Sequence, residues 1–285
     1  MREEACFRET GSMVTMMKLA FTTAGCPGWS FDEIFAAATD LAMDGIEIRG
    51  VGDEMYAPDC PCFSPAERAR TIERMNKAGV VFPVLDSAAA LGVPGGSDAA
   101  GIEARAYVDL ASALHAPYVR VMITPRAEPT PADEELCLEN YRALCDYAAG
   151  KGVTPLLETN GVFADTAVLS AFLDKAGREN SGVLWDVHHP FRYFGEAPEL
   201  TVSRLGKRIR HVHVKDSVVK DSMLQYRMMG YGDVPILDAV RALNAAGYEG
   251  MISLEWLKRW NPDLQEPGIV FAHYKNYMEF IFTQL

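Results

Sequence analysis

The stretch GVLWDVHH, residues 182–189, is an apolar run followed at once by Asp186, His188 and His189. The apolar part is typical of a buried β-strand, and segments of helical period lie on either side of it, near 164–178 and 196–207. A second run of the same kind, IRHVHVKD, follows at 209–216. Repeated strand–helix units predict a parallel sheet, because each crossover helix returns the chain to the same edge.

The alternation of strand and helix continues along the chain in both directions. Further strands are predicted at 17–23, 45–50, 80–87, 118–124, 154–160 and 251–256. Further helices are predicted at 30–44, 64–79, 101–116, 130–152, 235–246 and 269–285. Ser30 with Glu33 forms a capping box, whereas Ser64, Pro65 and Gly79 mark the start and the end of a second helix.

Eight such units in 285 residues predict an α/β fold, a single closed (β/α)₈ TIM barrel. The alternative is an open doubly wound sheet, which would carry a GxGxxG turn after the first strand, and TTAGCPGWS lacks this pattern. We expect one barrel domain over residues 17–285, preceded by an N-terminal extension, residues 1–16.

Composition excludes several classes of function. The chain is acidic, with a net charge of −12, so it repels phosphate backbones and is not expected to bind nucleic acid. Because no apolar run reaches 18 residues and the N-terminus does not resemble a signal peptide, no membrane segment is expected. The six cysteines form no CxxC pair, which favours reduced thiols and a cytoplasmic location.

Polar side chains gather late in the predicted strands, where the chemistry of a parallel barrel lies. They are Glu47, Arg49, Asp86, Arg120, Glu158, Asn160, Asp186, His188, His189, His211, His213, Lys215 and Glu255. Residues two apart on a strand share a face, so an inward-facing set would converge from the last four strands. This set is Glu158, Asp186, His213 and Glu255.

Three carboxylates and one imidazole are suitable ligands for one divalent cation. Oxygen ligands favour Mn²⁺ or Mg²⁺, and the imidazole also admits Co²⁺, Ni²⁺ or Zn²⁺. Any single acid at a strand end is more often a helix cap, and HVH alone is compatible with core histidines. Four such groups on four consecutive strands favour a metal site.

The motifs LLETN, LWDVHHP, HVHVKD and ISLEW resemble those of the xylose isomerase-like TIM-barrel superfamily of sugar isomerases and epimerases. The loop MMGYGDVPI, residues 228–236, is similar to the glycine-rich segment of that superfamily. Resemblance to the ketose 3-epimerase branch implies that the four residues above are the metal ligands. It also implies that His189 binds substrate. Arg227 and Lys215 are candidate substrate-binding cations, and Asn160 and Trp29 are further candidate contacts.

The resemblance implies proton transfer beside a carbonyl through an enediolate, with Glu158 and Glu255 as acid and base on opposite sides of one carbon. The expected partner is a small keto-sugar or polyol, unphosphorylated because no arginine cluster or glycine-rich phosphate cradle is evident. A homo-oligomer is also implied.

Several alternatives to an epimerase remain open. An inosose-type dehydratase or a hydroxypyruvate-type isomerase would use the same framework. An apurinic-site endonuclease-like phosphodiesterase is disfavoured by the charge and by the total of six histidines. A non-catalytic sugar-binding barrel is disfavoured because candidate acids are present on both sides of the site.

Overall fold

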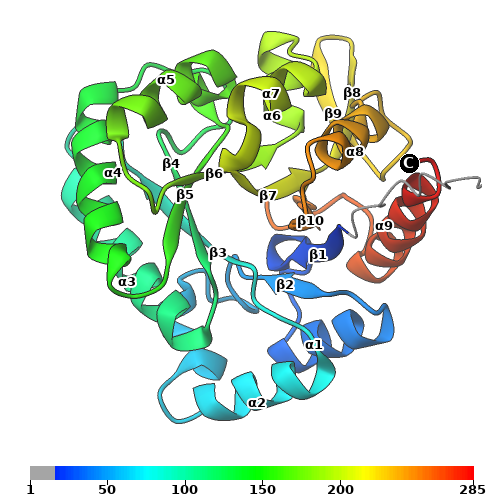
Figure 1. Cartoon of the computed structure of the whole chain (residues 1–285). Coiled ribbons are helices and arrows are strands. Elements are labelled where there is room, and N and C mark those ends of the chain that lie inside the picture. Colours follow the sequence, from blue (N-terminus) through cyan, green and yellow to red (C-terminus); the bar gives the residue numbers. More distant parts are fainter. Residues whose placement is uncertain (1–16) are drawn as a thin grey trace, which may run out of the picture.

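A computed structural model of the protein describes residues 17–285, and the predicted extension, residues 1–16, lies outside the described residues. Eight parallel strands form one sheet in the order β2-β1-β10-β7-β6-β5-β4-β3. They are β1 (Lys18–Thr22), β2 (Gly45–Glu47), β3 (Val84–Ala90), β4 (Tyr118–Met122), β5 (Thr154–Glu158), β6 (Gly182–Asp186), β7 (Ile209–Val214) and β10 (Met251–Leu254). The amide of Ile48 donates to the carbonyl of Val84 (3.2 Å), and that of Asp86 to the carbonyl of Ile48 (2.8 Å). These bonds join β2 to β3 and close the predicted barrel (Figure 1).

Helices surround the barrel and shield the outer face of its strands (Figure 1). They are α1 (Phe31–Asp40), α2 (Arg68–Ala78), α3 (Ser97–Leu114), α4 (Glu134–Ala149), α5 (Thr166–Ala176), α6 (His188–Phe194), α7 (Pro198–Leu205), α8 (Ile236–Ala245) and α9 (Pro267–Phe282). Short 3₁₀ turns lie at Thr23–Gly25, Ala57–Asp59, Pro61–Phe63, Gly161–Ala164 and Gly206–Arg208. Among these described elements, no helix has both the length and the apolar character needed to cross a bilayer.

The predicted helix signals are confirmed at α1 and only partly at α2. Ser30 and Glu33 form the predicted capping box, in which the Ser30 amide donates to the Glu33 carboxylate at 2.7 Å. The start of α2 at residue 64 is wrong, because the Ser64 carbonyl accepts from both Glu67 and Arg68 and makes a tight turn before the helix. Gly79 ends α2 in the left-handed conformation, as predicted.

The predicted strand at 182–189 is too long, because β6 ends at Asp186. The Asp186 carboxylate accepts from the amide of His188 at 2.9 Å and turns the chain into α6. Pro190 then occupies the first turn of α6, where a missing N–H is tolerated. The helix predicted near 196–207 is confirmed as α7, and α6 before it was not predicted.

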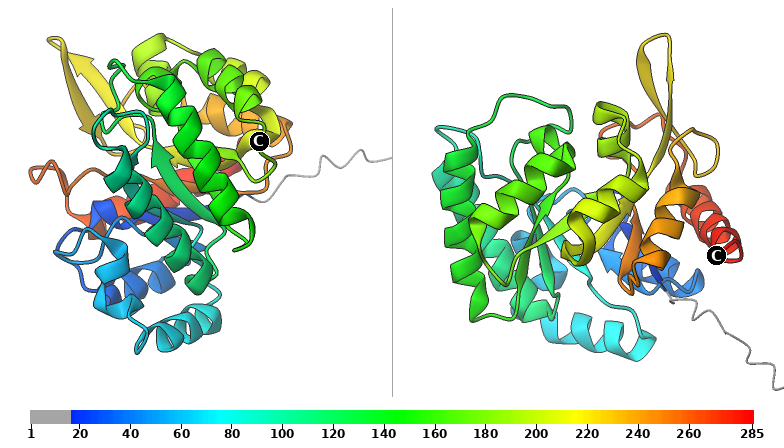
Figure 2. Two further views of the ribbon diagram at one scale, coloured as in Figure 1. Left: turned by 90° about the vertical axis from the view of Figure 1, so that its left-hand side faces the viewer. Right: turned by 45° about the horizontal axis from the view of Figure 1, so that its top comes forward.

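A β-hairpin of β8 (Asp216–Lys220) and β9 (Met223–Arg227) follows β7 directly, and the sequence analysis did not predict it. Its two turn residues, Asp221 and Ser222, have φ of 53° and 61°, a conformation that favours glycine or asparagine, so the usual hairpin signal is weak here. The hairpin projects from the body of the barrel on the side where β7 ends (Figure 2).

The interior of the barrel changes from apolar to charged along the strands. Val84, Leu156 and Leu184 form a small buried cluster, with Tyr118 packed against it. Two residues later on the same four strands lie Asp86, Glu158, Asp186 and Arg120, all buried. Period-two alternation therefore places an ionic layer directly above an apolar one, at the carboxyl end of the barrel.

Asp216 fixes the segment that follows the hairpin. Its carboxylate accepts from the amides of Ser217 (2.8 Å), Gly230 (2.9 Å), Gly232 (2.8 Å) and Val234 (3.2 Å). A Cβ on Gly232 would lie 2.0 Å from this carboxylate, so only glycine allows the approach.

We predict that Asp216→Asn lowers the free energy of unfolding by roughly 2 kcal/mol, because one carboxylate oxygen becomes an amide that cannot accept these bonds. Urea unfolding measures the change. The matched control is Asp221→Asn at the exposed hairpin turn, which should stay within about 0.5 kcal/mol of the parent. Equal stability of both variants would contradict the anchoring role.

Candidate active site

A broad depression of about 1300 Å³, open to solvent, lies at the carboxyl end of the strands. Charged and aromatic side chains form most of its wall. The lining residues are Arg49, Ala88, Arg120, Met122, Pro125, Arg126, Ala127, Glu128, Glu158, Asn160, His189, Lys215, Tyr226, Glu255, Leu257 and Trp260. Active sites of parallel barrels lie at this end, so the depression is the candidate active site.

The barrel brings three of the four predicted metal ligands together. Glu158 ends β5, His213 lies on β7, and Glu255 follows β10 with its amide bonded to the carbonyl of Val214 (3.0 Å). One ligand atom from each of these three residues lies within 4.8 Å of the others. This spacing is suitable for a single cation.

Asp186, the fourth predicted ligand, is buried beside this group and contacts Lys215. The Lys215 ammonium binds the Asp186 carboxylate and also donates to Glu255 at 2.5 Å. Burial lowers the pKa of a lysine, but Asp186 and Glu255 outweigh burial and raise the pKa of Lys215 above its usual value. Burial in turn raises the pKa of Glu255, but Lys215 and His213 outweigh it and lower that pKa to about 2.

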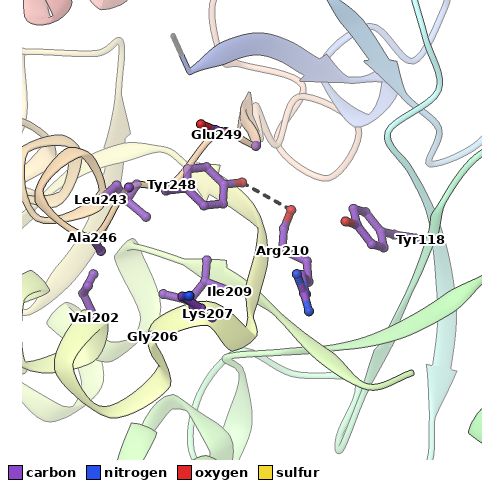
Figure 3. Close-up of a pocket in the computed structure, with 12 residues that line it drawn as sticks. Tyr118, Val202, Gly206, Lys207, Ile209, Arg210, Leu243, Ala246, Tyr248 and Glu249 are labelled. Atoms are coloured by element: carbon purple, nitrogen blue, oxygen red, sulfur yellow. Dashed lines mark hydrogen bonds between the residues drawn. The ribbon is translucent and has the colours of Figure 1, made fainter. Parts of the chain in front are cut away.

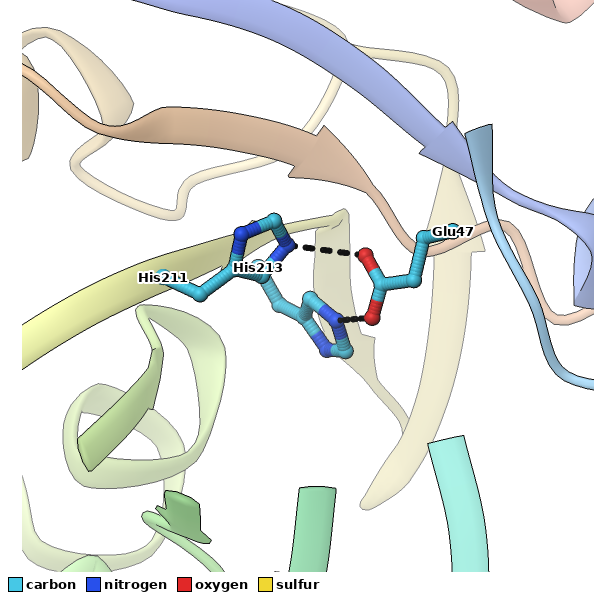
Figure 4. Close-up of side chains that lie close together, drawn as sticks. All are labelled: Glu47, His211 and His213. Carbon is cyan, nitrogen blue, oxygen red and sulfur yellow. Dashed lines mark hydrogen bonds and ion pairs between the residues drawn. The ribbon is translucent and has the colours of Figure 1, made fainter. Parts of the chain in front are cut away.

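Glu47, on β2, holds both histidines of β7 (Figure 4). One carboxylate oxygen lies 2.5 Å from Nε2 of His213, and the other lies 2.9 Å from Nε2 of His211. Burial raises the pKa of Glu47, but the two imidazoles outweigh it and hold this pKa well below its usual range. Burial lowers the pKa of His213, but Glu47 outweighs burial and raises it to about 10. The role of Glu47 could not be predicted from the sequence, because its partners lie more than 160 residues away along the chain.

One atom of this group, Nδ1 of His213, is suited to bind a divalent cation. Because Nε2 of His213 binds Glu47, its Nδ1 faces the other way, 3.8 Å from the carboxylate of Glu255. This Nδ1 is buried and has no hydrogen-bond partner. A carboxylate that orients a histidine from behind is the usual arrangement of a metal-ligating imidazole.

The neighbouring cations and imidazoles are fixed by buried contacts. Arg120 donates to Glu158 at 2.7 Å and lies 3.6 Å from Asp86. Burial lowers the pKa of Arg120, but Asp86 and Glu158 outweigh burial and raise it. Burial lowers the pKa of His189 to about 4, so its ring is neutral near pH 7. Its Nδ1 lies 3.0 Å from the carbonyl of Thr159 and 3.6 Å from Glu158.

The remaining predicted substrate contacts take different positions. Asn160 lines the depression and donates to the carbonyl of Thr124 at 2.9 Å. Arg227 lies on β9, where it donates to Gln225, and its neighbour Tyr226 lines the depression instead. Trp29 packs edge-on against Phe271, with ring centroids 5.9 Å apart, and is not part of the lining. Tyr226 was missed because the hairpin that carries it was not predicted.

A second pocket of about 910 Å³ lies at the opposite, amino-terminal end of the barrel (Figure 3). Tyr248 forms part of its wall, and its hydroxyl donates to the carbonyl of Arg210. None of the three acid–histidine groups found in residues 17–285 contributes to this wall. Its wall carries one acid, Glu249, and no histidine, so it lacks the paired acids and the imidazole of the candidate active site.

Comparison with known proteins agrees with this architecture. The family model described as xylose isomerase-like TIM barrel matches residues 35–272, so the chain belongs to that family. Among individual proteins, fructoselysine 3-epimerase of Shigella flexneri is 23% identical over 251 residues, which cover 84% of this chain and 90% of the relative.

Two solved structures share the fold. D-Allulose 3-epimerase from Methylomonas sp., in complex with D-allulose, has a TM-score of 0.72 and 19% identity, covering 96% of this chain and all of that one (100%). The IOLI protein with a zinc atom has a TM-score of 0.77 and 18% identity, covering 94% and 99% of the two chains.

We predict that Glu47→Gln lowers the free energy of unfolding by about 3 kcal/mol, because the carboxamide cannot accept from both imidazoles and loses the charge that pairs with His213. Urea unfolding measures the loss. Glu249→Gln, at the exposed opposite end, is the matched control and should change stability by less than about 0.5 kcal/mol. If the two variants unfold alike, Glu47 does not hold this network together.

Proposed function

We propose that this protein is a divalent-cation-dependent sugar isomerase, most closely an epimerase, which moves a proton at the carbon beside a carbonyl. One observation carries the proposal: Glu158 and Glu255 come from β5 and from the end of β10 and lie close to the unpartnered Nδ1 of His213. Two carboxylates beside one candidate cation site are suited to acid–base work on a bound carbon. The similarity to fructoselysine 3-epimerase supports this chemistry.

The proposed cation ligands are Glu158, Asp186, His213 and Glu255. A divalent cation held there supplies electrostatic stabilisation to the negative charge that develops on the substrate carbonyl. Oxygen-rich donors favour Mn²⁺ or Mg²⁺, and the imidazole keeps Zn²⁺, Co²⁺ and Ni²⁺ available. The zinc atom in the structure of the IOLI protein supports a divalent ion in this family.

Glu158 and Glu255 are the proposed acid and base. One carboxylate takes the proton from the carbon beside the carbonyl, and the other returns a proton to the opposite side, which inverts that centre. Arg120 orients Glu158 through its 2.7 Å bond, and Lys215 orients Glu255 through its 2.5 Å bond. Glu158 is buried and the Glu255 side chain is 12% exposed, so little of either carboxylate contacts bulk water.

Three further side chains of the depression would hold substrate oxygens. His189 is neutral and uses Nδ1 on the Thr159 carbonyl, and its Nε2, which lies 3.4 Å from the Asp186 carboxylate, would accept from a substrate hydroxyl. Lys215 and Asn160 line the same wall. A keto-sugar, with adjacent carbonyl and hydroxyl groups, matches these donors and acceptors.

A second candidate is an isomerase or a dehydratase on the same framework. The specific observation in its favour is that Lys215 binds both Asp186 and Glu255. If that ammonium stays on Glu255 during catalysis, only Glu158 transfers a proton and the centre is not inverted. The product of the reaction distinguishes the two candidates.

We predict that Glu158→Gln and Glu255→Gln each reduce turnover at least about 100-fold, because each removes one proton-transfer group. The assay incubates a panel of ketoses with Mn²⁺ in deuterated water and follows deuterium at the carbon beside the carbonyl. Glu128→Gln, on the exposed rim of the same depression, is the control and should keep most of the activity. Near-normal exchange in both site variants would refute the acid–base roles.

We predict that Asp186→Asn weakens binding of Mn²⁺ at least about tenfold, since even partners of metal ligands typically contribute 10–100-fold to affinity. Equilibrium dialysis followed by elemental analysis measures the metal content. Asp174→Asn, on the exposed end of α5, serves as control. Unchanged metal content in the Asp186 variant would remove it from the ligand set.

A further inference from the structure

The cations in the wall of the depression fall into two groups. Arg120 and Lys215 are each bound to two buried carboxylates, so their charges are already matched. Arg49 and Arg126 lie in the same wall but show no ion pair: within residues 17–285, no carboxylate oxygen lies within 4.0 Å of either guanidinium. Solvent can match the charge of the exposed Arg126, but Arg49 is partly buried, so its lack of an ion-pair partner needs an explanation.

Arg49 lies two residues beyond Glu47, on the same side of the extended chain, and is largely buried. Its guanidinium makes one long bond, 3.4 Å, to the carbonyl of Met55, and lies 5.9 Å from the centre of the Trp260 ring. Burial and the nearby charge of Arg120 lower the pKa of Arg49, and the charges of Tyr107, Asp86 and Glu103 offset this only in part. A guanidinium has five donors in a planar fork, most of which remain available here.

Arg126 is exposed on the segment that follows β4 and lines the same depression. Glu128, two residues further on, also lines the depression, and its charge contributes to the raised pKa of Tyr193 and of Tyr226. The half-exposed ring of Trp260 supports the Arg49 guanidinium as a cation–π partner. The Arg49 guanidinium therefore presents a planar, positively charged group in the wall of the depression.

We propose that Arg49, supported by Trp260 and assisted by Arg126, binds an oxyanion at the end of the substrate remote from its carbonyl. The substrate class is then an acidic keto-sugar, which carries a carboxylate or a phosphate, and not the neutral sugar that the sequence favoured. This inference rests on the proposed function, because the acids and the cation site would hold the carbonyl end. The planar guanidinium can donate two parallel hydrogen bonds to either oxyanion.

The test measures binding separately from turnover. Isothermal titration calorimetry of the full chain with Mn²⁺ compares D-fructose, D-fructose 6-phosphate and D-fructuronate, which differ at one terminal carbon. At least one anionic probe should bind about tenfold or more tightly than D-fructose, as expected for a charge-assisted bidentate contact. The better anion identifies the source of the oxyanion.

Arg49→Met should abolish this preference, Arg49→Lys should retain part of it, and Arg70→Met, an exposed control on α2, should leave it intact. Equal affinity of all three probes in the parent protein, or an unchanged preference in Arg49→Met, would overturn the proposal. If Arg49 only balanced the acidic layer, Arg49→Met would alter stability and not the ratio of affinities.

Deuterium uptake in the same samples separates this inference from the proposed function. Preference for an anion without exchange supports the oxyanion site and refutes the isomerase. Exchange of D-fructose together with equal affinity for the three probes supports the isomerase and refutes the oxyanion site.

Discussion

When a parallel sheet closes into a barrel, every second side chain of each strand points into an enclosed interior, where an unpaired charge is costly. In this protein the upper interior layer carries five buried or nearly buried carboxylates: Glu47, Asp86, Glu158, Asp186 and Glu255. Two cations, Arg120 and Lys215, and the His213 imidazole lie between these acids, and each contacts two of them. His189 lies 3.6 Å from Glu158 and 3.4 Å from Asp186 and so links the Arg120 group to the other acids, which makes the mouth of the barrel one connected polar network.

This network explains why residues from distant strands act together. Glu47 orients the His213 ring, and that orientation leaves Nδ1 facing Glu255. Lys215 binds Asp186 and Glu255, two of the proposed cation ligands, so an arriving divalent ion would take over part of the role of its ammonium. Charge compensation, and not apolar packing, is the main constraint on this end of the barrel.

The rim obeys a different constraint from the interior. Loops and the β8–β9 hairpin extend beyond the strands (Figure 2), and many of their side chains, Arg126 among them, are exposed, so an exposed cation there does not need a protein partner. This division allows the interior to keep one chemistry while the rim selects the substrate. Arg126 and Trp260 belong to the rim, whereas Arg49 lies at the boundary between the rim and the interior. Because Arg49 is partly buried, its lack of an ion-pair partner points to a ligand.

Local pattern alone was enough to predict the barrel, the strands that carry Glu158, Asp186 and His213, the strand that Glu255 follows, and the cap at Ser30, because period-two alternation and helix capping depend on near neighbours. The turn at Asp186, the hairpin with Tyr226, and the displaced positions of Arg227 and Trp29 depended on contacts that those patterns do not encode. The partners of Glu47 and Lys215 depended on closure of the barrel. Which acid pairs with which cation is decided only when the circle of strands brings them together and burial makes every unpaired charge costly.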